Sequence, residues 1–225
     1  MNIAFRERWV ILLQLPITLA LLAAPIDQIA KAALLLLVWA VTFRRLSLSD
    51  ALLFVLASAV FTVMNILAIQ GGVFRFENPT FATLPAYEFF MWGFYFLHMR
   101  RLLAHEERVL SWRAGLGTVV FALPFLIFTG HTTHLILLLA ALALLLALFH
   151  SKGDIMYGVY AVFLGVAIEW VGVTTGEWSY PGSLHSVPPW SYAMWAGCGI
   201  LLRRFAAPLA DTLAARMTGA TRRQS

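Results

Sequence analysis

The sequence predicts an all-α polytopic membrane protein with eight transmembrane helices, arranged as two parallel four-helix repeats with both termini in the cytoplasm. Composition is the first observation: of 225 residues, 61% are hydrophobic and only 12% are charged, which excludes an ordinary soluble domain. The second is that long apolar segments lie end to end, separated by short charged or Gly/Pro-marked breaks. The third is an internal repeat about one hundred residues long, described below.

Eight apolar segments are candidate membrane spans. They cover residues 9–24, 28–43, 50–70, 84–102, 114–129, 133–149, 154–174 and 188–206. Several of them contain only 15–17 residues, which is at or just below the lower limit for crossing a hydrocarbon core of about 30 Å. The count falls to seven if one short hairpin does not cross.

The basic residues orient the eight segments. With eight spans, one side of the membrane carries only Lys31 and Arg75. All other basic clusters lie on the opposite side, namely Arg6, Arg8, Arg44, Arg45, Arg100, Arg101, Arg108, Arg113, Lys152, Arg203 and Arg204. Excess positive charge marks the cytoplasmic face, so we expect a multi-pass protein of the inner (plasma) membrane with both termini inside. The net charge of +5 follows from this topology and does not indicate nucleic acid as a partner.

A cleaved secretory signal is an alternative interpretation of the N-terminus, because two arginines precede an apolar run that ends in small residues. The repeat favours a retained first helix, since Leu15-Pro16 has a counterpart in Leu123-Pro124 of the fifth segment.

The internal repeat relates the two halves of the chain. The segment 84–92 (LPAYEFFMW) recurs as 187–195 (VPPWSYAMW), and each runs without a gap into an arginine pair. Upstream, Asp50, Asn65 and Gly72 recur with identical spacing as Asp154, Glu169 and Gly176. The repeat predicts residues 1–103 as the first unit, 104–113 as a cytoplasmic linker, 114–206 as the second unit and 207–225 as a basic cytoplasmic tail.

The repeat also predicts which polar residues share a level in the membrane. Asn65 and Glu169 each lie fifteen residues from their helix starts, which corresponds to about 22 Å at 1.5 Å per residue. Glu88 lies twelve residues before Arg100, or about 18 Å from the inner surface, and Ser191 is its counterpart. These four side chains are expected to face one central space in the outer half of the membrane.

A carboxylate at that depth costs about 2–3 kcal/mol, so it seldom points at lipid. For Glu169 the alternative to a functional role is a hydrogen bond to the overlying loop, and for Glu88 it is a contact with the positive end of its own helix. Glu77 and Glu177 are expected to be solvated in the outer loops.

Helix-start carboxylates have simpler expected roles. Asp50 and Asp154 are expected to cap the helices that begin beside them. Asp27 and Lys31 are expected to form an ordinary pair four residues apart.

The two outer loops, residues 70–83 and 174–187, are long and rich in Gly, Pro and aromatic residues. One interpretation is the aromatic belt at a membrane interface. The other is that each loop folds back as a lid over a cavity between the repeats, because non-helical backbone at that depth must be covered by protein. Matched Trp92 and Trp195 would normally be packing residues, and in a cavity holding a cation they would stabilise its charge.

No metal or other cofactor is expected. His131, His134 and His185 lack a cysteine or carboxylate to complete a metal site, and His98 is expected to form an interfacial hydrogen bond or to relay protons. The sequence contains no nucleotide, haem or redox motif, and its single Cys198 is expected to be a buried small residue.

Two segments resemble known families. Residues 85–90 (PAYEFF), behind an aromatic loop and within a repeat, resemble the Pro-x-x-Glu segments of membrane-integral lycopene cyclases. Residues 169–180 (EWVGVTTGEWSY), followed by Val187-Pro188 and Trp195, resemble a pattern of carotenoid hydratase-type biosynthesis proteins. The match departs from the cyclases in having a single acid after the proline, and in having no acid at Trp190-Ser191 of the second repeat.

The resemblance implies an enzyme without cofactors that acts on a lipid-soluble polyprenoid, such as a carotenoid or terpene, by cyclisation or hydration at a C=C bond. It implies Glu88 and Glu169 as the acid and base, and Asn65 as a residue that orients substrate or water. The implied substrate-binding residues are Phe76, Tyr87, Trp92, Trp178, Tyr180, Trp190 and Trp195.

Two other functions remain open from the sequence. One is a transporter or binding protein for a small or lipidic solute, because parallel repeats around a polar cluster suit alternating access. The other is an accessory or structural subunit of a membrane complex. Membrane lipids and a lipid-soluble ligand are the expected partners, and the sequence does not specify an oligomeric state.

Overall fold

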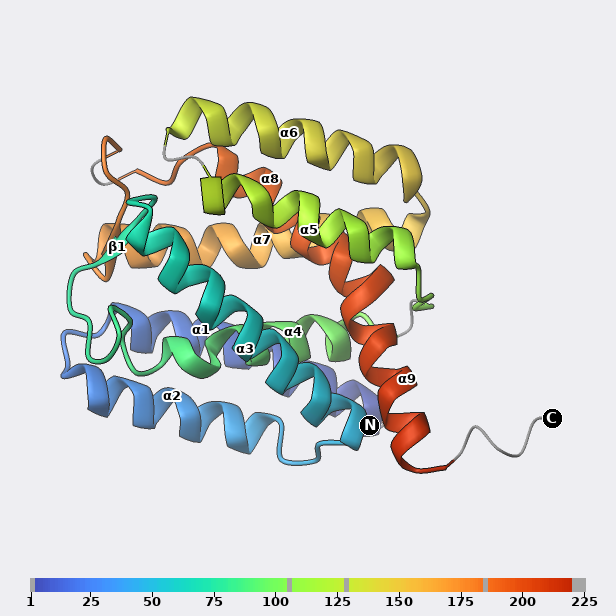
Figure 1. Cartoon of the computed structure of the whole chain (residues 1–225). Helices are drawn as coiled ribbons and strands as arrows, with labels where there is room; N and C mark the ends of the chain where they lie inside the picture. The colour runs from blue at the N-terminus through green and yellow to red at the C-terminus, as the bar shows by residue number, and fades with distance from the viewer. Residues whose placement is uncertain (1–2, 105–106, 128–129, 184–185, 220–225) are drawn as a thin grey trace.

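The protein folds as a bundle of packed helices (Figure 1). The computed structural model describes residues 3–104, 107–127, 130–183 and 186–219. The helices are α1 (Ile3–Ala23), α2 (Gln28–Thr42), α3 (Leu48–Gln70), α4 (Glu88–Leu102), α5 (Trp112–Ile127), α6 (His131–Leu148), α7 (Lys152–Thr174), α8 (Trp190–Leu201) and α9 (Ala207–Met217). A short π-helical segment, η1 (Leu202–Ala206), joins α8 to α9, and two short strands are β1 (Arg75–Phe76) and β2 (Trp178–Ser179). The all-α prediction is confirmed.

Three of the described helices are long and apolar enough to cross a membrane: α3, α6 and α7. Shorter apolar helices cover Arg8–Ala23, Gln28–Thr42 and Trp112–Ile127. The eight predicted segments correspond to α1–α8, although residues 128–129 at the end of the fifth lie outside the described residues.

The chain beyond residue 206, predicted as a basic cytoplasmic tail, includes a further helix as far as Met217. Helix α8 continues through η1 into α9, which packs against α3. In Figure 1, α9 runs toward the N-terminal end of α3. The sequence of α9 is rich in alanine, and Pro208 lies in its first turn, where a missing N–H is tolerated. Its buried residues Ala207, Pro208 and Ala210 present small side chains to the bundle.

The packing of the helices follows the internal repeat. Helix α1 packs on α2 as α5 packs on α6, and α3 packs on α4 as α7 packs on α8. Each half also contributes its third helix to the other half, because α3 packs on α5 and α7 packs on α1. The halves therefore interlock, and α3 runs diagonally across the view in Figure 1.

The two strands lie at one end of the bundle, which we call the strand end. They pair antiparallel, with Arg75 opposite Ser179 and Phe76 opposite Trp178. Arg75 and Ser179 are equivalent positions of the repeat, so their pairing is what a two-fold relation between the halves produces. Glu77 lies beside this pair, where a hydrogen bond from the Ser179 hydroxyl and the nearby Arg75 guanidinium lower the pKa of its carboxyl.

The opposite end, which we call the arginine end, carries two matched ion-pair clusters. Asp50 and Asp154 each complete a capping box, which confirms their predicted role as helix caps. Arg101 contacts Asp50 at 2.8 Å, and Arg204 contacts Asp154 at 2.6 Å. The arginine pairs at the end of each repeat therefore neutralise the cap carboxylate of the preceding helix.

Candidate functional site

An elongated cavity of about 260 Å³ lies between the two halves. Its wall includes α3 from Leu56 to Ala68, a rise of about 18 Å along the helix axis. The polar side chains Asn65, Glu88 and Glu169 lie toward the strand end of this wall, whereas its opposite part is formed by residues such as Leu201, Phe205 and Leu209. The cavity is therefore polar at one end and apolar along the rest of its length.

Both predicted acidic residues line this cavity. Glu88, the first residue of α4, is 2% exposed. Its Oε1 accepts hydrogen bonds from Asn65 Nδ2 at 2.5 Å and from Trp92 Nε1 at 2.8 Å. Its Oε2 is buried and has no hydrogen-bond partner among the described residues. One carboxyl oxygen of Glu88 is therefore available to a ligand.

Glu169, on α7, is surrounded by donors. Its Oε2 accepts hydrogen bonds from Trp178 Nε1 at 2.9 Å and from Tyr180 OH at 2.7 Å. Its Oε1 accepts a longer one, 3.4 Å, from Trp195 Nε1. The expected alternative for Glu169, a hydrogen bond to the overlying loop, is therefore present. Both of its oxygens are already used within the protein, so Glu169 holds the loop of β2 against α7.

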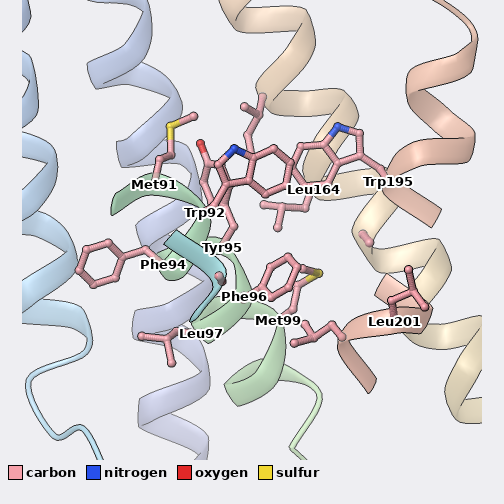
Figure 2. Packing of buried hydrophobic residues seen from close by; sticks show 14 of the residues in the cluster. Met91, Trp92, Phe94, Tyr95, Phe96, Leu97, Met99, Leu164, Trp195 and Leu201 are labelled. Atoms are coloured by element: carbon pink, nitrogen blue, oxygen red, sulfur yellow. The ribbon is translucent and has the colours of Figure 1, made fainter. Parts of the chain in front are cut away.

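The matched tryptophans form a link between the two carboxyl groups. The rings of Trp92 and Trp195 stack with centroids 4.8 Å apart and planes 15° apart, and Figure 2 shows them lying against each other. Each indole donates to the carboxyl group of its own half. Phe61 stacks on the other face of Trp92 at 3.9 Å. This aromatic stack forms the floor of the polar end of the cavity.

Two glycines of α7 make room for these rings. A Cβ on Gly165 would lie 2.0 Å from the Trp195 ring, and a Cβ on Gly172 would lie 2.0 Å from the Trp178 ring. Real Cβ atoms do not approach so closely, so the absence of a side chain at each position is what lets the indole reach Glu169.

The cavity reaches the exterior of the bundle beside α3. Val60 lines the cavity and is also 51% exposed. Thr118 and Ala122 of α5 and Leu209 of α9 also line the cavity and are partly exposed. The opening is therefore lateral, between helices, and faces the apolar outer surface of the bundle.

Most of the predicted binding residues line the cavity. They are Phe76, Trp92, Trp178, Tyr180, Trp190 and Trp195. Tyr87 does not line it, and its hydroxyl donates to Glu177 Oε2 at 3.0 Å. Ser191, predicted to share the central space, is fully buried with a hydroxyl that has no partner among the described residues, but it is not part of the cavity wall.

The expectation that Glu177 is solvated is wrong. Glu177 is 8% exposed and forms an ion pair with Lys31, which is 1% exposed. Gln28 Nε2 donates to the same carboxyl group at 3.0 Å. The expected Asp27–Lys31 pair is therefore absent among the described contacts, because Asp27 caps α2 and the lysine points inward. The Lys31–Glu177 ion pair was not predictable from the sequence, because the two residues come from different halves of the chain.

The histidines have structural partners. His98 is 2% exposed and is hydrogen-bonded through both ring nitrogens, to Gln14 and to Tyr160. His131 contacts the Pro181 carbonyl oxygen at 2.6 Å. Within the described residues, no group of three His, Cys, Asp or Glu side chains could hold a metal ion, and His185 lies outside those residues.

Some cavity residues were not predicted. Tyr95 lines the cavity, and its buried hydroxyl has no partner in the described part of the chain. It lies three residues after Trp92, on the same face of α4, so helical spacing would have identified it. Phe61 and Phe121 also line the cavity, but nothing in their sequence spacing indicates it, because their positions depend on how α3 and α5 pack across the two halves.

The fold and the site define a helical membrane protein with a lateral, mostly apolar cavity. No protein-family profile matches the chain, and no curated protein sequence matches it. Two solved structures share its fold. The chain is similar to a mycobacterial Insig homologue, MvINS, from Mycobacterium vanbaalenii, with 18% identity and a TM-score of 0.58 over 72% of this chain and 94% of that one. A cross-linked trimer of MvINS gives 18% identity and a TM-score of 0.62 over 75% and 95%.

These structures correct the functional prediction. The hypothesis of a carotenoid- or terpene-modifying enzyme is wrong, because the proteins that share this fold are Insig homologues and not cyclases or hydratases. The site agrees with the correction, since both oxygens of Glu169 are occupied by protein donors and are not free to act on a substrate.

Proposed function

We propose that this chain is an accessory protein of a membrane complex that binds one lipidic molecule in the cavity between its halves. The observation that carries the proposal is the unpartnered Glu88 Oε2 at the polar end of an otherwise apolar cavity. A buried polar atom without a partner costs about 1–3 kcal/mol, and a ligand group that donates a hydrogen bond would remove that cost.

The chemistry of the polar end favours a ligand with a hydroxyl group. Such a group donates to Glu88 Oε2 and, through its lone pairs, accepts from the unpartnered Tyr95 hydroxyl. The remaining wall is formed by aromatic and aliphatic side chains that suit a hydrocarbon body. The ligand would lie along α3 with its head at the strand end.

The size and opening of the cavity favour a ligand drawn from the bilayer. At about 260 Å³ the cavity is slightly smaller than the roughly 300–1,000 Å³ of typical small-molecule sites. The opening beside Val60 would let the ligand enter sideways and leave part of its hydrocarbon chain in the lipid.

The proposal includes the predicted topology of eight spans with both termini cytoplasmic in the plasma membrane. Its support is the separation of charge along the bundle. The four arginines Arg100, Arg101, Arg203 and Arg204 gather at the arginine end, while the strand end carries the paired loops. The accessory role is supported by the fold shared with an Insig homologue, one structure of which is a cross-linked trimer.

Photolabelling with a diazirine-bearing long-chain alcohol tests this function. The purified chain in lipid nanodiscs should be labelled on α3, α4 or α5 with saturable dependence on the probe. Glu88→Leu should weaken binding about 5- to 100-fold, because it leaves the hydroxyl group of the ligand buried without a partner, which costs about 1–3 kcal/mol.

The matched control is Glu77→Leu, which alters a carboxylate in the exposed strand-end loop, outside the cavity wall. It should leave labelling unchanged. Wild-type protein that is labelled only non-saturably, or labelled equally in the Glu88→Leu variant with its melting temperature unchanged, would refute the proposed site.

A further inference from the structure

The internal repeat generates two equivalent crevices, of which one is open. The cavity opens where α3 of the first half meets α5 of the second. Its counterpart is where α7 of the second half meets α1 of the first. If the halves were alike, a second cavity would lie there.

Three residues of the open cavity have larger or polar counterparts at the second crevice. Leu56 on α3 corresponds to Tyr160 on α7, with the offset that relates Asp50 to Asp154. Leu201 on α8 corresponds to His98 on α4, with the offset that relates Trp92 to Trp195. Ala122 on α5 corresponds to Gln14 on α1, with the offset that relates Pro16 to Pro124. Leu56, Ala122 and Leu201, the aliphatic residue of each pair, all line the open cavity.

At the second crevice, His98 contacts both of the other polar members, Gln14 and Tyr160. His98 Nδ1 lies 2.8 Å from Gln14 Oε1, and His98 Nε2 lies 2.7 Å from the Tyr160 hydroxyl oxygen. The rings of His98 and Tyr160 stack with centroids 5.8 Å apart and planes 12° apart. These side chains therefore occupy the space that, in the other half, belongs to the cavity.

The network is anchored in the core of the first half. Gln14 Nε2 donates to Thr18 Oγ1 at 2.6 Å, and Trp39 Nε1 donates to the same hydroxyl at 2.8 Å. Gln14, Thr18 and His98 are 3%, 0% and 2% exposed, so these three members are shielded from the exterior, and Tyr160 is partly buried. A buried polar network in which each member is paired holds one fixed arrangement, since any displacement leaves unpaired groups.

We propose that Gln14, His98 and Tyr160 are specificity-determining residues that fill a second ligand crevice and so limit the chain to one lipidic ligand, which enters beside α3 and α5. The inference rests on the proposed function for the nature of the ligand. The filling of the crevice itself is independent of that function.

The test exchanges the residues that differ between the two crevices. The triple variant Gln14→Ala, His98→Leu, Tyr160→Leu gives the closed crevice the side chains of the open one. The reverse triple variant Leu56→Tyr, Ala122→Gln, Leu201→His gives the open cavity the side chains of the closed one. Crystals of each are exposed to xenon, which occupies apolar cavities, and each protein is labelled with the long-chain alcohol probe.

Wild-type protein should hold xenon only beside α3 and α5 and carry one saturable label per chain. The first triple variant should hold additional xenon between α1 and α7 and take up a second label per chain. The reverse variant should lose both xenon and label. If the first variant does not fold, single Tyr160→Leu, which removes one ring from the crevice, should still admit xenon between α1 and α7.

The outcomes separate the two proposals. Absence of xenon between α1 and α7 in every folded variant would overturn the inference. A single label per chain in the variant, with xenon at both crevices, would overturn the limit on ligand number. Xenon at both crevices of the first triple variant would support the filling role. If the wild type then shows no saturable label, the proposed lipid-binding function is refuted instead.

Discussion

At the scale of single residues, the two halves use the same positions for different chemistry. Asn65 and Glu169 are equivalent, and so are Glu88 and Ser191, yet each half has only one acid at this level. Asn65 donates to Glu88, whereas Glu169 accepts from three aromatic donors. The repeat thus places one carboxyl group with a free oxygen in the cavity and uses the other to hold the strand-end loop.

The close approach of Trp178 to α7 gives a prediction at this scale. Gly172→Ala would place a methyl group 2.0 Å from the Trp178 ring and displace it from Glu169. Overpacking of this kind costs about 1–3 kcal/mol. The melting temperature in detergent should fall, and the fluorescence of the buried tryptophans should shift.

Gly130→Ala is a matched control for Gly172→Ala. Its Cβ would lie 3.6 Å from the nearest atom, Thr133 Oγ1, at an ordinary φ of −82°. It should leave the melting temperature nearly unchanged. Equal melting temperatures for the Gly172→Ala variant and the wild type would show that the tryptophan can move without cost.

At the scale of secondary-structure elements, α9 is the part that the repeat does not predict. It closes one side of the cavity through Leu209, and Asp211 attaches it to the arginine end. Asp211 Oδ1 accepts from Arg100 at 2.6 Å and from the Ser49 hydroxyl at 2.5 Å. The π-helical segment η1 lies immediately before it, where one extra residue changes the direction of the helix.

Asp211→Asn should loosen α9 without disturbing the core. It removes the charge that attracts Arg100 and weakens a contact that is partly solvated, with a side chain 41% exposed. Hydrogen exchange of the α9 amides should quicken several-fold while α7 amides remain protected.

Arg216→Ala, at the exposed end of the same helix, is the control for α9 and should leave the exchange pattern unchanged. Identical α9 exchange in the Asp211→Asn variant would mean that apolar packing alone holds the helix against α3.

At the scale of the whole molecule, the halves are joined by contacts that cross the repeat boundary. Helices α3 and α7 each pack on the other half, and the strands pair across it. Lys31 of α2 contacts Glu177 of the second outer loop, and both are nearly inaccessible to solvent. Such a pair fixes how the halves meet, because removing one member leaves an unpaired buried charge.

Lys31→Met should therefore destabilise the protein by about 3–5 kcal/mol, while the double variant Lys31→Met, Glu177→Gln should recover much of that loss. Unfolding in detergent, followed by circular dichroism against denaturant, measures both. If the double variant has the same free energy of unfolding as Lys31→Met alone, the loss of stability does not come from an unpaired Glu177 carboxylate.

Hydropathy and spacing were sufficient to predict α1–α8, because each of these helices coincides with a continuous apolar segment bounded by charged, Gly or Pro residues. The capping boxes at Asp50 and Asp154 were predictable because a cap depends on residues within four positions. The cavity-facing positions of Glu88, Trp92 and Trp195 followed from the repeat, which related segments far apart in the chain.

The sequence by itself determined the all-helical class, the approximate positions of α1–α8 and the duplication, since each depends on local composition or fixed spacing. Only the tertiary structure decided that Glu177 is paired, that α9 covers the bundle, and that one crevice is hollow while the other is filled by His98 and its partners. These features arise from side chains of opposite halves that meet only after the helices pack, so no spacing along the chain encodes them.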